Sequence, residues 1–230
     1  MSEESNELIR EVTSSLRNDK IKEFYIKNSK KIIIGLVVIL LVIAVVVGKN
    51  IYLNKKNEKY SINIQNSITS QQVGKISESK EDLEKVFFDK SAPENLKAIA
   101  GFRLAAVYLT DKSEDNSQKV LSIYEEISKC KSCDPYSSDL AGMLWVKFII
   151  TNNKDGSYEE LVKKIEEIEK SSKHYKYEIA IDRAFYELSK DHLKKSQEIF
   201  ESVANSLEAT QSVKDVAKQG LRIVQQKSAK

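Results

Sequence analysis

The sequence predicts an all-α protein in which one N-terminal transmembrane helix precedes a domain of α-helical hairpins. Two observations support this prediction. Residues 32–47 form an unbroken run without a polar side chain, and nearly every later segment repeats its apolar residues at the helical period. No segment shows the sustained alternation typical of a strand, so we predict no sheet. The chain then divides into an N-terminal tail (1–31), a span (32–53) and a helical domain (54–230).

The apolar run becomes long enough to cross a bilayer if Lys49 extends its ammonium group toward the lipid headgroups. Residues 32–53 then cover roughly 30 Å of hydrocarbon at about 1.5 Å per residue. A cleaved signal peptide fits less well, because 31 residues precede the run and no small-residue cleavage site follows it. The sequence therefore predicts an uncleaved single-pass anchor in the lipid bilayer. The residues that we assign to this membrane anchor are Ile32, Gly35, Val47 and Tyr52, of which Tyr52 is an aromatic residue at the membrane interface.

The charges beside the span favour a cytoplasmic N-terminus. Six Lys or Arg side chains lie in residues 17–31, against four in residues 49–63. Basic residues are retained on the cytoplasmic side of a span, and a long C-terminal domain can be translocated whatever its charge. We therefore expect residues 54–230 to lie outside the cytoplasm.

The composition excludes several function classes for the helical domain. The chain carries 37 basic and 34 acidic side chains with the two signs interspersed, so we expect no nucleic-acid partner. The seven glycines are widely spaced, whereas phosphate-binding loops require clustered glycines. No cofactor is implied, and we expect no enzyme activity.

The helical domain is predicted from seven apolar stripes. They are Leu96, Ala100, Leu104 and Tyr108; Val120, Ile123, Tyr124 and Ile127; Leu140, Leu144 and Phe148 with Trp145 beside them; Tyr158, Leu161, Val162, Ile165 and Ile168; Ile181, Ala184, Phe185 and Leu188; Leu193, Ile199, Phe200, Val203 and Leu207; and Val213, Val216, Ala217, Gly220 and Val224. Helices of this length on short joints pack as antiparallel hairpins. Pro93 suits a helix start, and Ser157 stands at capping-box spacing from Glu160.

Two segments match the spacing of tetratricopeptide units, in which small residues stand where two helices cross closely. The first segment contains Ala180, Ala184, Leu188, Ser196, Phe200 and Val203, with Asp191 and His192 at the turn. The second contains Gly101, Leu104, Ala105, Tyr108, Val120, Tyr124 and Ile127, if the polar loop over residues 111–117 is longer than usual. The alternative is an irregular helical bundle.

The N-terminal half resembles a known family. An aromatic pair, Phe24 and Tyr25, precedes Asn28 and Lys30 before the span, and Tyr52 and Tyr60 follow it. This pattern, together with the alanine-rich segment over residues 95–109, is similar to the YfgM-type ancillary subunit of the SecYEG translocon. The Lys-, Ile- and Asn-rich composition also resembles that of uncharacterised single-span proteins of Rickettsia-like bacteria.

The resemblance implies a bacterial inner-membrane protein with a periplasmic tetratricopeptide-like domain. Its partners would be the SecYEG-type translocon and exported or periplasmic proteins, which it would help to hand over to periplasmic chaperones. The family supplies no catalytic residues.

Cys130 and Cys133, the only cysteines, form the sharpest remaining motif. A redox CxxC pair usually follows a strand, and none is predicted here. A structural zinc site requires four ligands, while the only histidines, His174 and His192, stand far along the chain. In an oxidising compartment the pair can form a local disulfide, and free thiols are the alternative. For the histidines we expect a solvated polar role rather than catalysis.

These observations favour a membrane-anchored protein-interaction module, because hairpin arrays present concave surfaces that hold peptides or partner helices. An envelope-assembly or division scaffold is an alternative that differs only in its partner. A redox protein using Cys130 and Cys133 is a further alternative, which replacement of both cysteines by serine would test.

Overall fold

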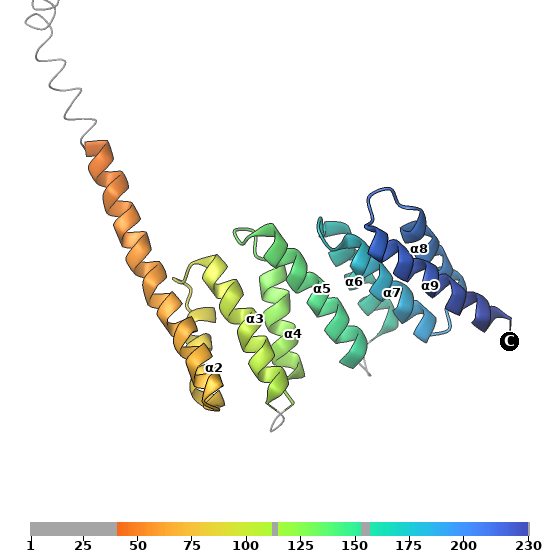
Figure 1. Ribbon diagram of the computed structural model, residues 1–230, viewed down its shortest axis with the longest axis horizontal. Helices are drawn as coiled ribbons and strands as arrows, with labels where there is room; N and C mark the ends of the chain where they lie inside the picture. Colours follow the sequence, from red (N-terminus) through yellow and green to blue (C-terminus); the bar gives the residue numbers. More distant parts are fainter. Residues whose placement is uncertain (1–40, 112–114, 153–156, 230) are drawn as a thin grey trace, which may run out of the picture. The chain divides into compact units, whose positions relative to one another are not determined.

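The computed structural model describes residues 41–111, 115–152 and 157–229, and these residues form helices and joints without any strand (Figure 1). The prediction of an all-α protein is therefore confirmed. The chain separates into two compact units, Met1–Lys56 and Asn57–Lys230. The second unit begins three residues after the domain start that the sequence predicts.

The described part of the first unit is helical, and its apolar side chains are exposed. Val47 is 49% exposed and Tyr52 is 66% exposed. Ile32 and Gly35 of the predicted anchor lie outside the described residues. Within the described ranges, no helix combines the length and apolar character that crossing a membrane requires.

The second unit is a series of helices on short joints. Residues 57–72 of this unit are helical. They are followed by α2 (Ile76–Phe87), α3 (Glu94–Thr110), α4 (Ser117–Ser128), α5 (Pro135–Asn152), α6 (Tyr158–Ser171), α7 (Lys176–Ser189), α8 (Leu193–Asn205) and α9 (Gln211–Ser228). Each helix from α2 onward packs against the next, and α7 also packs against α5 and α9. Contacts between alternate helices are what stacked hairpins produce.

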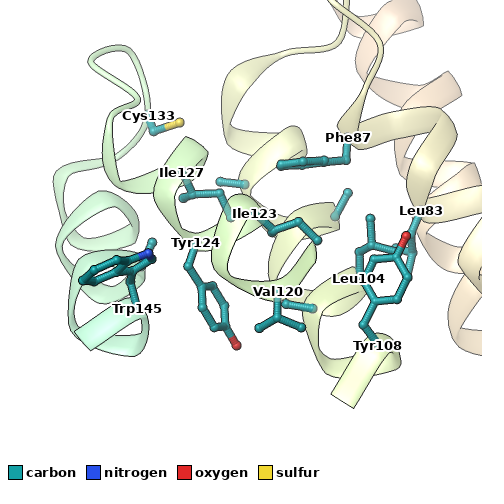
Figure 2. Packing of buried hydrophobic residues seen from close by; sticks show 14 of the residues in the cluster. Leu83, Phe87, Leu104, Tyr108, Val120, Ile123, Tyr124, Ile127, Cys133 and Trp145 are labelled. Atoms are coloured by element: carbon teal, nitrogen blue, oxygen red, sulfur yellow. The ribbon is translucent and has the colours of Figure 1, made fainter. Parts of the chain in front are cut away.

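The core of the second unit runs along this series in two clusters. One extends from Tyr60 to Tyr186, and the other from Ala180 to Val224. Figure 2 shows the part of the first cluster where side chains of α2 and α3 meet those of α4. Leu83 and Leu104 are fully buried there. Burial of one such side chain stabilises the fold by about 1.5–3 kcal/mol.

Most of the predicted stripes face this core. On α4, all four stripe residues are buried: Val120, Ile123, Tyr124 and Ile127. The stripe predicted for α5 is confirmed in part: Trp145 is buried, and Leu144 and Phe148 are half-buried against the core. The other fully buried residues of this helix are Ala141, Gly142 and Val146, which the stripe does not include. Helix α5 carries apolar residues on several of its sides, so the sequence pattern does not show which face is buried.

Leu207 is a correction to the prediction, since it is 97% exposed rather than part of the α8 stripe. Helix α8 ends at Asn205, and the next residue, Ser206, adopts an extended backbone conformation. The side chain of Leu207 therefore lies beyond the helical face that carries Phe200 and Val203.

Small residues mark the close helix crossings. Ser196 of α8 is fully buried, and its hydroxyl donates a hydrogen bond to the carbonyl oxygen of Ala184 on α7 at 2.8 Å. On α3, a Cβ at Gly101 would lie 2.7 Å from the Phe87 ring and 2.8 Å from Ile127. All six positions of the first tetratricopeptide-like segment are buried.

The joints between the helices lie close to where the sequence predicts them, but their details differ. Pro93 stands one residue before α3 rather than at its first position. Ser157 precedes α6 as predicted, but its side chain makes no capping hydrogen bond, so the capping box with Glu160 does not form. Residues 112–114, within the predicted loop over residues 111–117, and residues 153–156 lie outside the described residues.

Candidate functional site: the cysteine joint and three clefts

The joint between α4 and α5 contains the cysteine pair. Cys130 and Cys133 are linked by a disulfide, with their Cα atoms 5.4 Å apart. The carboxylate of Glu94, the first residue of α3, places Oε2 at 3.7 Å from the sulfur of Cys130. Its backbone carbonyl oxygen lies 3.6 Å from the sulfur of Cys133. The pair therefore lies against the start of a helix from an earlier part of the chain.

Hydrogen bonds hold this joint on α3. The backbone N–H of Asp134 donates to Oδ1 of Asn95 at 3.0 Å. The hydroxyl of Ser138 donates to the carbonyl oxygen of Cys130 at 3.0 Å. The carboxylate of Asp134 accepts from the backbone N–H of Ser137 in the first turn of α5 at 3.2 Å. The joint that carries both cysteines is consequently held against the start of α3, where Glu94 lies.

His174 ties the joint between α6 and α7 to α5. Oδ2 of Asp139 accepts from the backbone N–H of His174 at 2.9 Å and lies 2.9 Å from its Nδ1. The ring also stacks on Tyr136 with centroids 3.6 Å apart. Burial alone would raise the pKa of Asp139, but the hydrogen bonds from the backbone N–H groups of His174 and Lys173 and from the His174 ring together outweigh it, so the pKa is lowered. His174 is therefore a structural residue rather than a simply solvated one.

His192, an exposed residue at the joint between α7 and α8, hydrogen-bonds to a buried carboxylate of α7. Glu187 is 1% exposed, and its Oε2 accepts a very short hydrogen bond from the Tyr158 hydroxyl. Nδ1 of His192 lies 2.8 Å from the same oxygen. Burial and the neighbouring Glu187 carboxylate raise the pKa of Tyr158. Sequence analysis did not single out Glu187, because a glutamate within a helical pattern reads as a surface residue.

Asp182 of α7 is a second acidic residue that the sequence does not mark. Its Oδ2 is buried and finds no hydrogen-bond partner among the described residues. Burial raises the pKa of this carboxyl group to about 6, and Glu178 adds to the shift while Lys147 on α5 opposes it. The side chain therefore destabilises the fold when it is ionised.

We consider three clefts on the described part of the second unit. The most apolar of these has a volume of about 370 Å³, and its walls include Phe87 and the adjoining Phe88 at the end of α2, Tyr108 of α3 and Ile123 of α4. Phe88 is 61% exposed at this cleft and packs edge to face on Phe87 with ring centroids 5.0 Å apart. An exposed aromatic ring on a fixed apolar wall is a suitable contact for an apolar side chain of another protein.

The other two clefts are more polar. One lies between α6, α7 and α8, where Arg183 is held by Glu169 through two hydrogen bonds of 2.8 and 3.3 Å. The other lies between α4, α5 and α6, where Lys164 lies 4.3 Å from the centroid of the Trp145 ring and 3.0 Å from Glu125. Arg183 and Lys164 are thus already paired with carboxylates.

The polar clusters do not assemble into a known catalytic arrangement among the described residues. His174 and His192 hydrogen-bond to carboxylates and a tyrosine, and neither contacts a serine or cysteine side chain. A nucleophile of the usual kind would need such a contact with its base.

Comparisons with known proteins give no match. No family model, no curated protein and no solved structure is similar to this chain at the level that counts as a match.

Proposed function

We propose that this protein is a membrane-anchored protein-interaction module whose binding surface includes the apolar cleft over α2, α3 and α4. The single observation that carries the proposal is Phe88, which is exposed beside buried Phe87 at the edge of this cleft. Large apolar rings that remain in water on a rigid surface favour association, because burying them releases their hydration.

The described part of the first unit supports the anchor. Its large apolar side chains between residues 41 and 53 are all substantially exposed and have no protein core to bury them. They are Leu41, Val42, Ile43, Val45, Val46, Val47, Ile51, Tyr52 and Leu53. A bilayer is a solvent in which such a surface is stable. We infer that residues 32–53 form one span and that the N-terminus is cytoplasmic.

The proposed task follows from the anchor, the helical unit and the resemblance in the N-terminal half. The protein acts as an accessory of the Sec translocon, in the inner membrane of a bacterium, and receives exported proteins as they leave the channel. The anchor keeps the cleft close to the membrane, which raises its effective concentration for membrane partners. Tetratricopeptide-like hairpins supply the surface that passes the client to periplasmic chaperones.

Site-specific photocrosslinking in native membranes tests this proposal. A probe at Phe88 reports on the cleft, whereas Tyr108 is unsuitable because it is buried. A probe at Tyr136 is the matched control, since this aromatic residue is equally exposed but lies against His174 at another joint. A probe at Tyr25 reports on the anchor.

The proposal predicts that Phe88 captures exported proteins or a periplasmic chaperone, that Tyr25 captures a translocon subunit, and that Tyr136 captures neither. Capture of envelope-assembly or division proteins by both probes, without the translocon, would assign the chain to a scaffold instead. Equal capture by Phe88 and Tyr136 would show that the cleft is not the binding surface.

A further inference from the structure

The geometry points to a metal site: in their reduced form, Cys130 and Cys133 together with Glu94 bind one Zn²⁺ ion. The two sulfur atoms and a carboxylate oxygen of Glu94 lie within 4.8 Å of one another. Glu94 stands 36 residues before Cys130 in the sequence, so only the fold reveals this third ligand. The inference does not depend on the proposed interaction function.

The three side chains suit the chemistry of zinc. Thiolates bind Zn²⁺ at about 2.3 Å and carboxylate oxygens at about 2.0–2.2 Å. In a tetrahedral site the two sulfurs then lie about 3.8 Å apart, which free thiols on adjacent turns of a short joint can adopt. Oε2 of Glu94 already faces Cys130 at 3.7 Å. Three protein ligands leave the fourth position to water, as in zinc sites that are open to solvent.

The surroundings orient the carboxylate and balance the charge. Oε1 of Glu94 lies 3.6 Å from the ammonium group of Lys97, so its two oxygens face different partners. Two thiolates and one carboxylate carry three negative charges, which Zn²⁺ and the Lys97 ammonium neutralise together. The ligands also belong to segments that hydrogen bonds already join, since Asn95 accepts from the backbone of Asp134. Preformed ligands bind a metal more tightly than mobile ones.

The disulfide and the metal are alternative states of the same sulfurs. A dithiol or phosphine reductant supplies two electrons, which break the S–S bond, and two protons yield two thiols while the reductant is oxidised. Binding of Zn²⁺ then releases both thiol protons as two Zn–S bonds form. The occupancy of the site therefore reports whether its compartment keeps the pair reduced.

Metal titration of the full-length purified protein in detergent tests the site. The protein is reduced with a phosphine, and Co²⁺ serves as the spectroscopic probe before displacement by Zn²⁺. We expect one equivalent of Co²⁺ with thiolate-to-metal charge-transfer absorption in the reduced protein and none in the oxidised protein. Replacement of both cysteines by serine should abolish the absorption while the far-UV circular dichroism remains helical.

The variant Glu94→Gln tests whether Glu94 is a ligand or whether the two thiolates bind the metal without it. This variant should weaken Zn²⁺ binding at least tenfold, because it loses an anionic ligand and keeps the size of the side chain. Glu126→Gln is the matched control, since Glu126 is an exposed carboxylate near the end of α4 and lies outside the ligand cluster. Absence of charge-transfer absorption in the folded, reduced protein would overturn the inference. Equal affinity of Glu94→Gln and the unmodified protein, or equal weakening by Glu94→Gln and Glu126→Gln, would also overturn it.

Discussion

The ring of Phe200 lies directly over Gly220, so that a Cβ at position 220 would stand 2.4 Å from Cζ of that ring. Phe200 belongs to α8 and Gly220 to α9, and both are buried. Phe185 of α7 holds the ring from another side, edge to face, with centroids 5.0 Å apart. The ring therefore has little room to withdraw, and this glycine sets how closely α8 and α9 approach.

Gly220→Ala should destabilise the protein by up to about 2 kcal/mol. Overpacking against Phe200 costs about 1–3 kcal/mol, and the better helix propensity of alanine returns about 1 kcal/mol. Chemical denaturation followed by circular dichroism measures the difference. Phe200→Leu should reduce the effect of the alanine by at least about 0.5 kcal/mol, because it shortens the side chain at the clash. Stabilisation by Gly220→Ala alone would contradict the close approach.

Phe200→Ala should cost about 3–5 kcal/mol, since the ring is fully buried and its removal leaves a cavity between three helices. The same denaturation experiment measures it. A loss below about 1 kcal/mol would show that this side chain faces solvent or a groove.

Tyr158→Phe should destabilise the protein by about 1.5–3 kcal/mol, because the Glu187 carboxylate is buried and loses a donor. The control is Tyr177→Phe, which removes a hydroxyl that donates to Glu208 at 2.8 Å on the exposed surface. That change should stay within about 0.5 kcal/mol. Similar values for both variants, measured by thermal or chemical denaturation, would mean that burial of Glu187 adds nothing to its hydrogen bond.

Asp182→Asn should stabilise the protein at pH 7 and have little effect at pH 4. The pKa of Asp182 in the folded state is raised to about 6 from 3.8, so the neutral carboxyl group is favoured. The folded state therefore binds more protons than the unfolded state between these two pKa values, and stability falls as the pH rises from about 4 to about 6 and then levels off. After allowance for partial solvent screening, the gain at pH 7 is about 1–2 kcal/mol. Asp215→Asn, on the exposed surface of α9, is the control and should show no such dependence. A constant difference between pH 4 and pH 7 would contradict the shifted pKa.

The predictive power of the sequence differs between elements for physical reasons. The stripe on α4 is correct in every residue because polar residues occupy its opposite face, so one orientation buries all the apolar residues. The prediction is only partly correct for α5, because apolar residues lie on several sides of this helix and the contacts with α4, α6 and α7 decide which of them are fully buried. It fails for Leu207, because periodicity alone does not show that α8 stops at Asn205.

The candidate site is harder to predict from the sequence than the helices are, because its residues come together only through tertiary contacts. The cysteine spacing suggests a local pairing, but nothing in the sequence links Glu94 to that joint. Glu187 is likewise one of many glutamates, and only the approach of Tyr158 and His192 explains its burial. The exposure of Phe88 depends on where α2 ends, since its neighbour Phe87 is buried.

The central claim is that a single span holds the helical unit outside the cytoplasm, and protease treatment of intact spheroplasts tests it most directly. A C-terminal tag after Lys230 follows the fate of residues 57–230, and a known cytoplasmic protein reports on leakage. The account predicts that added protease removes the tag and digests the helical unit while the cytoplasmic marker survives. A helical unit that remains intact until the membrane is permeabilised would contradict the account and place the cleft and the cysteine joint in the cytoplasm.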